Sequence, residues 1–103
     1  MAMVFDILEE EKKRLMELKE KYERQISMLP KGSISRKKRW NREYMYLAYR
    51  EADKIKFDYI GPVDSDVAKK LSEKIEKRRE LENKLQQVDK NLKDVERGLR
   101  GKQ

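Results

Sequence analysis

The chain has 103 residues, of which 46% are charged and 37% are hydrophobic, and its formal net charge is +7. This length allows one small domain, residues 1–103, with a limited core. The sequence contains no cysteine and no histidine, which excludes disulfides, thiolate nucleophiles and Cys/His zinc sites. No apolar run reaches the ~20 residues that a membrane-spanning helix needs, and no signal-peptide pattern follows Met1. We therefore expect a cytoplasmic protein that does not enter a membrane.

The first predicted element is a helix over residues 6–29. Apolar side chains recur along it at heptad spacing and would form one continuous stripe: Leu8, Leu15, Tyr22 and Leu29. Asp6 and Glu9 have the spacing of a capping pair, in which each side chain satisfies a backbone N–H of the first turn. Pro30 and Gly32 should end the helix, because proline cannot continue the hydrogen-bond ladder and glycine permits a sharp turn.

A longer helix is predicted over residues 65–99, with Asp64 or Ser65 as its N-cap. Its apolar residues follow a heptad pattern over more than four heptads, as in a coiled-coil seam. The two helices should pack antiparallel, and the second outruns the first by roughly 10 residues, on the order of 15 Å. This overhang predicts a homodimer, or binding of a partner helix, through the end of the seam: Leu85, Val88, Leu92, Val95 and Leu99. The overhang shrinks if residues 1–5 are also helical.

Between the helices, residues 33–61 are predicted to form a three-stranded antiparallel β-meander. Three runs with strand propensity alternate with short turns, at residues 33–40, 43–50 and 54–60. The fold class is therefore α+β, mostly α. We expect an antiparallel, coiled-coil-like helical hairpin with the meander inserted between its two long helices.

Strand register decides which side chains share a face, because a slip of one residue reverses all of them. We predict a two-residue turn at 41–42 and a three-residue connection at 51–53, since this pairing collects eight apolar or aromatic residues on one face. Those eight would pack on the helices: Ile34, Trp40, Met45, Leu47, Tyr49, Ile55, Phe57 and Tyr59. The opposite, outer face would then carry the candidate nucleic-acid-binding residues: Lys37, Arg39, Tyr44, Tyr46, Arg50, Lys54 and Lys56. A two-residue second turn would instead mix the faces.

The main functional hypothesis concerns this outer face, because residues 31–60 carry a net charge of +5. Cations meet phosphates and bases stack on aromatic rings, so the face predicts a nucleic-acid-binding or accessory module for DNA or RNA. A competing interpretation is that the tyrosines are only good strand formers on a half-buried sheet. The alternative function is a structural or adaptor protein that dimerises, or binds a partner helix, through the seam.

We expect no enzymatic activity. The sequence contains no P-loop, no dinucleotide-binding glycine motif and no nucleophile–base pair. Helical carboxylates such as Glu76 and Glu80 have Lys or Arg three or four residues away, as in solvated ion pairs. We therefore predict no catalytic residues, no metal ligands, no cofactor and no small-molecule substrate.

The chain contains, in order, a leader, three short motifs and a long charged helix: L-P-K-G-S from Leu29, Y-x-Y-L-x-x-R-E from Tyr44, K-x-K from Lys54 and Y-I-G from Tyr59. Over about residues 29–97 this order resembles a family of short domains of unknown function, mainly archaeal and bacterial. That family usually has glycines after Arg-Glu where this chain has Ala52-Asp53, so the second turn should differ. The resemblance implies a meander followed by a helix, and it implies no activity.

Overall fold

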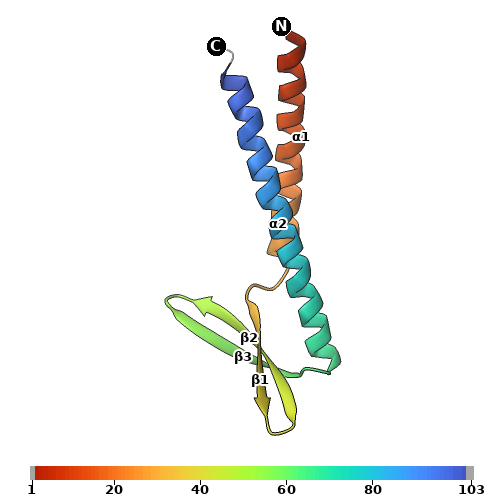
Figure 1. Ribbon diagram of the computed structural model, residues 1–103, viewed down its shortest axis with the longest axis vertical. Coiled ribbons are helices and arrows are strands. Elements are labelled where there is room, and N and C mark those ends of the chain that lie inside the picture. The colour runs from red at the N-terminus through yellow and green to blue at the C-terminus, as the bar shows by residue number, and fades with distance from the viewer. Residues whose placement is uncertain (1, 102–103) are drawn as a thin grey trace. The chain divides into compact units, whose positions relative to one another are not determined.

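The computed structural model describes residues 2–101, with side chains from residue 4 onward. Five elements follow one another along the chain (Figure 1): α1 (Ala2–Ser27), β1 (Ser33–Arg39), β2 (Arg42–Glu51), β3 (Lys54–Pro62) and α2 (Asp66–Arg100). The α+β, mostly α prediction is confirmed, with a three-stranded antiparallel sheet between two long helices. The chain divides into two compact units. We call them the helix pair, made of α1 and of α2 from Glu80 onward, and the sheet unit, Leu29–Arg79.

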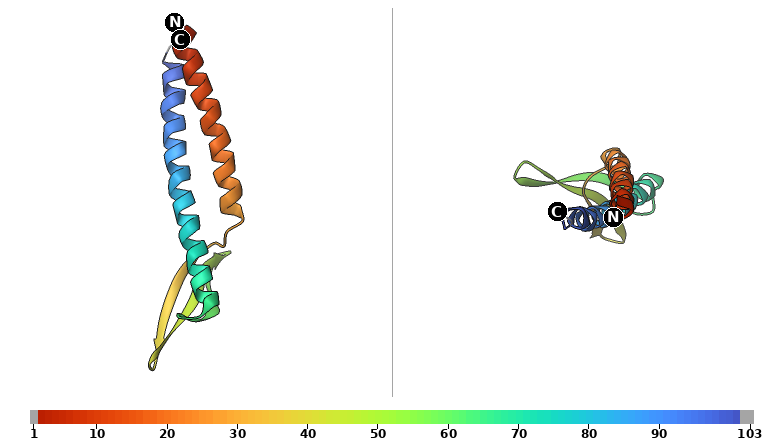
Figure 2. Two further views of the ribbon diagram at one scale, coloured as in Figure 1. Left: turned by 90° about the vertical axis from the view of Figure 1, so that its right-hand side faces the viewer. Right: turned by 90° about the horizontal axis from the view of Figure 1, so that it is seen from above.

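In the helix pair, the predicted apolar stripe of α1 packs on the heptad seam of α2. Leu15 is 1% exposed and forms a buried cluster with Val88 and Leu92, and three half-buried residues pack around it: Leu18, Tyr22 and Val95. The two helices run antiparallel, so that α1 begins where α2 ends (Figure 2). Burial of these apolar side chains is the main stabilising contribution here, because the ion pairs Arg14–Glu11, Lys19–Asp89, Arg24–Glu20 and Arg97–Asp94 lie on exposed surface, where each contributes little.

The bounds of α1 correct two predictions. The helix occupies Ala2–Ser27 rather than residues 6–29, so Asp6 lies inside it and cannot serve as its cap. The earlier start lengthens α1 and removes the predicted overhang of α2. The expectation that Val88 and Leu92 would be uncovered in a monomer is therefore wrong, because both are buried against α1. Leu85, Val95 and Leu99 are half-buried.

In the sheet unit, one face of the meander packs on the first turns of α2. Met45 of β2 is 1% exposed, and it is buried together with Ala68 and Ile75 of α2. The Ser72 hydroxyl lies 3.8 Å from the Met45 sulfur. Ser65 caps α2 as predicted, since its Oγ accepts a hydrogen bond from the Ala68 N–H at 3.3 Å.

The first hairpin has the predicted distribution of faces with a shifted turn. Arg39 pairs with Arg42, so the two turn residues are Trp40 and Asn41 rather than Asn41 and Arg42. The shift moves the pairing of β1 by two residues, which leaves every paired side chain on its expected face. Trp40 is the exception. It lies in the turn, 96% exposed, instead of packing on the apolar face.

The second hairpin contradicts the predicted register. Glu51 pairs with Lys54, so Ala52 and Asp53 form a two-residue turn and Arg50 lies opposite Ile55. Every β3 side chain that pairs before the bulge is consequently on the opposite face from the one expected. A β-bulge between Met45 and Tyr46 then shifts the pairing by one residue at the far end of the hairpin.

Gly32 occupies a conformation that other residues rarely adopt, with φ of +123°, and a Cβ there would lie 2.5 Å from the Ala48 carbonyl oxygen. We expect Gly32→Ala to lower the free energy of unfolding by about 2 kcal/mol, because backbone must move to relieve the clash. Gly98→Ala is the matched control, since its Cβ would meet only Leu8 at 3.4 Å. It should raise stability by about 0.5 kcal/mol through better helix propensity. Urea unfolding of both variants checks the pair, and a neutral Gly32→Ala would contradict the close approach.

Candidate functional site

Cross-strand pairing defines the two faces of the sheet. We call outer face the one directed away from α2, and inner face the one that contains Met45. The outer face is formed by alternate residues of the three strands: Ser33, Ser35, Lys37, Arg39, Arg42, Tyr44, Tyr46, Ala48, Arg50, Ile55, Phe57 and Tyr59. Contacts between side chains on each face agree with this assignment.

Three tyrosine rings on the outer face form a contiguous cluster, and Phe57 is linked to it through Lys37. The Tyr46 and Tyr59 rings meet edge to face, with centroids 5.5 Å apart, and the Tyr44 and Tyr59 centroids are 6.1 Å apart. Phe57 and Tyr59 stay 50% and 58% exposed, whereas Tyr44 and Tyr46 are half-buried. The cluster holds its rings in place while it leaves part of their surface open to a ligand.

Lys37 crosses this cluster from β1. Its Nζ lies 5.0 Å from the Tyr46 ring centroid and 4.7 Å from the Phe57 centroid. These are cation–π distances, so the ammonium group is held over the rings rather than extended into water. The arrangement places a positive charge next to the open ring surfaces.

Charge is segregated between the two faces. The outer face carries Lys37 and three arginines, at positions 39, 42 and 50, and no carboxylate. Within residues 2–101 none of these three guanidinium groups forms an ion pair. The carboxylates of the strands, Glu43, Glu51 and Asp58, all belong to the inner face.

Inner-face cations lie among carboxylates, and two polar contacts link side chains of this face. Lys56 Nζ lies 2.9 Å from a Glu51 oxygen, and the Tyr49 hydroxyl donates to Asp58 at 3.3 Å. Loss of hydration, followed by the Asp58 charge, raises the pKa of Tyr49 above its ordinary value, so this hydroxyl remains a donor at neutral pH. The outer-face cations, by contrast, have no carboxylate on their own face.

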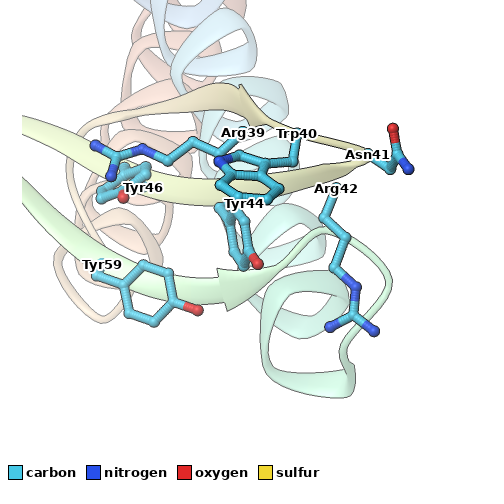
Figure 3. A pocket seen from close by; sticks show the side chains of 7 residues that line it. All are labelled: Arg39, Trp40, Asn41, Arg42, Tyr44, Tyr46 and Tyr59. Carbon is cyan, nitrogen blue, oxygen red and sulfur yellow. The ribbon is translucent and has the colours of Figure 1, made fainter.

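An open hollow of about 610 Å³ lies at the β1–β2 end of the outer face. Figure 3 shows its lining: Arg39, Trp40, Asn41, Arg42, Tyr44, Tyr46 and Tyr59. These side chains offer ring faces and fixed positive charge, and none is a carboxylate. Their chemistry is therefore that of stacking, hydrogen bonding and ion pairing.

Trp40 adds a fifth ring beside the cluster, at the tip of the first hairpin. It is the single tryptophan of the chain, and its backbone has φ of +62°. A bulky side chain is uncommon in this left-handed region, which costs roughly 1 kcal/mol or more. The hairpin thus holds an indole almost fully in solvent in a conformation that glycine or asparagine would adopt more readily.

Five of the seven predicted site residues lie on the outer face as expected: Lys37, Arg39, Tyr44, Tyr46 and Arg50. Lys54 and Lys56 do not, because the two-residue turn places them on the inner face. Sequence reasoning assigned Phe57 and Tyr59 to the buried face and missed them. The alternative of a two-residue second turn, which the sequence analysis rejected, would have placed both residues on the outer face.

Within residues 2–101, no helix is long and apolar enough to cross a membrane. The same residues contain no group of three acidic side chains placed to hold a metal ion.

Comparison with known proteins identifies a family. Residues 8–70 match the family described as "Domain of unknown function (DUF6788)". The matched range begins in α1 and ends in the first turns of α2, whereas the resemblance in the meander suggested residues 29–97. No curated protein and no solved structure matched the chain. Because the match covers more than half of the sequence and the whole meander, the chain belongs to the DUF6788 family of domains of unknown function.

Proposed function

We propose that the outer face binds nucleic acid and that the protein is a binding module rather than an enzyme. The carrying observation is that the outer face bears four cations without a carboxylate, next to rings that remain half exposed. Phosphates would meet the cations and bases would meet the rings. We propose no catalytic step, cofactor or small-molecule substrate for this face. A cytoplasmic location fits a chain without cysteine.

Charge placement supports nucleic acid over simple solubility. Cations that serve only solubility are commonly interspersed with carboxylates, as Lys56 and Glu51 are on the inner face. The outer face instead leaves Arg39, Arg42 and Arg50 unpaired. Arginine carries several donors in a fixed planar group, which suits phosphate oxygens.

Ring exposure supports binding over a purely structural role for the aromatics. Tyr44 and Tyr46 are half-buried, and packing between rings accounts for them. About half of the surface of Phe57 and Tyr59 is exposed to solvent. A register shifted by one residue would have placed both rings on the inner face, towards α2. Contiguous exposed apolar surface with charged neighbours is typical of interaction sites.

The seam of α2 gives no comparable support to the adaptor function. Val88 and Leu92 lie at the centre of the predicted partner site, and α1 already packs against both. A partner helix would have to displace α1 from the buried cluster around Leu15. We therefore leave dimerisation through the seam out of the proposed function.

We expect Arg39→Gln/Arg42→Gln to weaken binding of DNA and RNA and to reduce its dependence on salt. Four phosphate contacts give a slope of log affinity against log salt of about −3 to −4, and loss of two should reduce its magnitude by about 1.5. Lys38→Gln/Lys54→Gln is the matched control, because it removes the same charge from exposed residues of the inner face. Fluorescence anisotropy between about 50 and 200 mM salt measures the slopes.

Three results of this experiment count against the proposed function. Equal losses in the two double variants would show that net charge, and not the outer face, drives binding. Binding of heparin with the same affinity as DNA and RNA would also show that net charge drives binding. Absence of binding to any nucleic-acid probe at about 50 mM salt would reject the function outright, since ion pairing is strongest there.

A further inference from the structure

We infer, on the basis of the proposed function, that the outer face selects unpaired bases, so that its ligand is a single-stranded segment of nucleic acid rather than a duplex. The first reason is the kind of surface that the rings present. In a duplex the base faces are covered by neighbouring bases, and a protein reaches only base edges and phosphates. The half-exposed rings of Phe57 and Tyr59 can stack only on bases whose faces are open.

Cations and rings are distributed differently over the three strands of the outer face: β1 carries cations, β3 carries rings, and β2 carries both. Lys37 and Arg39 lie on β1, β2 combines Arg42 and Arg50 with Tyr44 and Tyr46, and β3 contributes Phe57 and Tyr59 but no cation. Neighbouring strands are about 4.8 Å apart, so β1 and β3 are separated by about 10 Å. A single strand would fit with its phosphates along β1 and its bases turned across β2 towards β3.

The spacing along the strands favours bases that are not stacked on one another. Outer-face residues alternate along a strand, as Phe57 and Tyr59 do, and alternate residues are about 6.8 Å apart. Successive bases in a duplex strand are separated by about 3.4 Å. An extended single strand can therefore give each ring its own base, whereas a stacked strand cannot.

Trp40 extends the row of rings past the end of the sheet. It lines the hollow together with Tyr44 and Tyr59 (Figure 3), and the hollow is large enough for a base. Strained backbone conformations that persist are frequently found at binding sites, and Trp40 combines such a conformation with 96% exposure. We assign Trp40 as the ring that covers the last base at this end of the site.

The charge of the face argues against a protein partner as the main ligand. Exposed Tyr, Trp and Arg are also frequent in protein interfaces. The cores of such interfaces are, however, depleted in charge, whereas this face concentrates four cations within its three strands. A polyanion whose bases also offer aromatic faces matches both the cations and the rings of the outer face.

The experiment compares three probes of equal length, about 12 nucleotides. They are a single strand, the duplex formed from that strand and its complement, and a strand in which every base is replaced by an abasic site. We expect the intact single strand to bind at least about 10-fold more tightly than the other two. Trp40 should report the contact directly, since the chain has no other tryptophan. Its fluorescence should be quenched by the intact strand and unchanged by the abasic one.

Leucine substitutions separate stacking from apolar burial. Phe57→Leu and Tyr59→Leu keep an apolar side chain but remove the planar ring, and each should weaken single-strand binding by about 5- to 150-fold. Tyr49→Leu is the control, because it removes a ring from the inner face. It should leave the affinity unchanged, and circular dichroism before the titrations establishes that each variant is folded.

The outcomes separate this inference from the proposed function. Equal affinity for the intact and the abasic strand, or tighter binding of the duplex, would overturn the selection of unpaired bases and leave nucleic-acid binding standing. A loss in Tyr49→Leu as large as that in Tyr59→Leu would also overturn it. Binding to none of the three probes would reject both statements, and tight binding of an acidic peptide instead would identify a protein-binding surface.

Discussion

Replacing Leu92 by lysine is expected to lower the free energy of unfolding by about 3 kcal/mol without any change in oligomeric state. Leu92 is 7% exposed and belongs to the buried cluster with Leu15 and Val88. Loss of a buried leucine alone costs about 2–5 kcal/mol, and an ammonium group in its place has to reach water past α1. Urea unfolding followed by helical circular dichroism measures the effect.

Leu99→Lys provides the contrast within the same heptad series. Leu99 is only half-buried, near the end of α2, and its replacement should cost about 1 kcal/mol or less. If the seam instead held a homodimer together, both variants would lower the molecular mass measured by light scattering. A wild-type dimer that becomes a folded monomer in Leu92→Lys would contradict the packing described for the helix pair.

Met45→Asp is expected to have the largest effect in the sheet unit, a loss of about 4 kcal/mol. Met45 is 1% exposed and lies against α2 beside Ser72, Ala68 and Ile75. The substitution removes a buried apolar side chain and adds a carboxylate, and the nearby Ser72 hydroxyl offers it a single hydrogen bond. Met45→Leu conserves the volume and should cost less than about 1.5 kcal/mol.

Amide hydrogen exchange locates the damage in Met45→Asp. Amides of β1, β2 and β3 should lose protection, because the sheet has its buried contact with α2 through this side chain. Unchanged protection in all three strands would show that Met45 is not the anchor of the sheet.

Much of the fold follows from local patterns in the sequence. The heptad stripe of α1 and the seam of α2 identify the buried residues Leu15, Val88 and Leu92, because periodicity reports one buried face. Ser65 marks the start of α2, because a hydroxyl there satisfies a backbone N–H. The start of α1 at Ala2 could not be found in this way, since Met1, the residue before Ala2, is not of a capping type.

The register of β3 could not be predicted from the sequence because its turn uses a residue type that rarely forms such turns. Two-residue hairpin turns need a positive φ, which normally calls for glycine or asparagine, and this chain has Ala52 at φ of +56°. The assumption that aromatic residues share the buried face then favoured the wrong pairing. In the structure, about half of the surface of Phe57 and Tyr59 is exposed to solvent. The assumption therefore fails for these two residues, which lie on the exposed face of the sheet.

The same limit explains why Trp40 was misplaced. Its φ of +62° lies in a region that tryptophan seldom occupies, so the sequence favoured a turn one residue later. Both errors therefore come from non-glycine residues in left-handed turns. The predicted faces of β1 and β2 agree with the structure, because the first turn is shifted by one residue and the pairing by two, an even number that keeps each paired side chain on its face.

The two residues between β2 and β3 give related chains a short evolutionary route to a different ligand. Deletion of Ala52, with closure by another two-residue turn, would set Arg50 opposite Lys54 and turn β3 over. Lys54, Lys56 and Asp58 would then replace Ile55, Phe57 and Tyr59 on the outer face, opposite Arg50, Ala48 and Tyr46, although no residue of the strands had mutated. In such a lineage one codon lost from a hairpin would replace the apolar outer-face residues of β3 mainly by charged ones, so turn length deserves to be compared before side chains when relatives are assigned a common role.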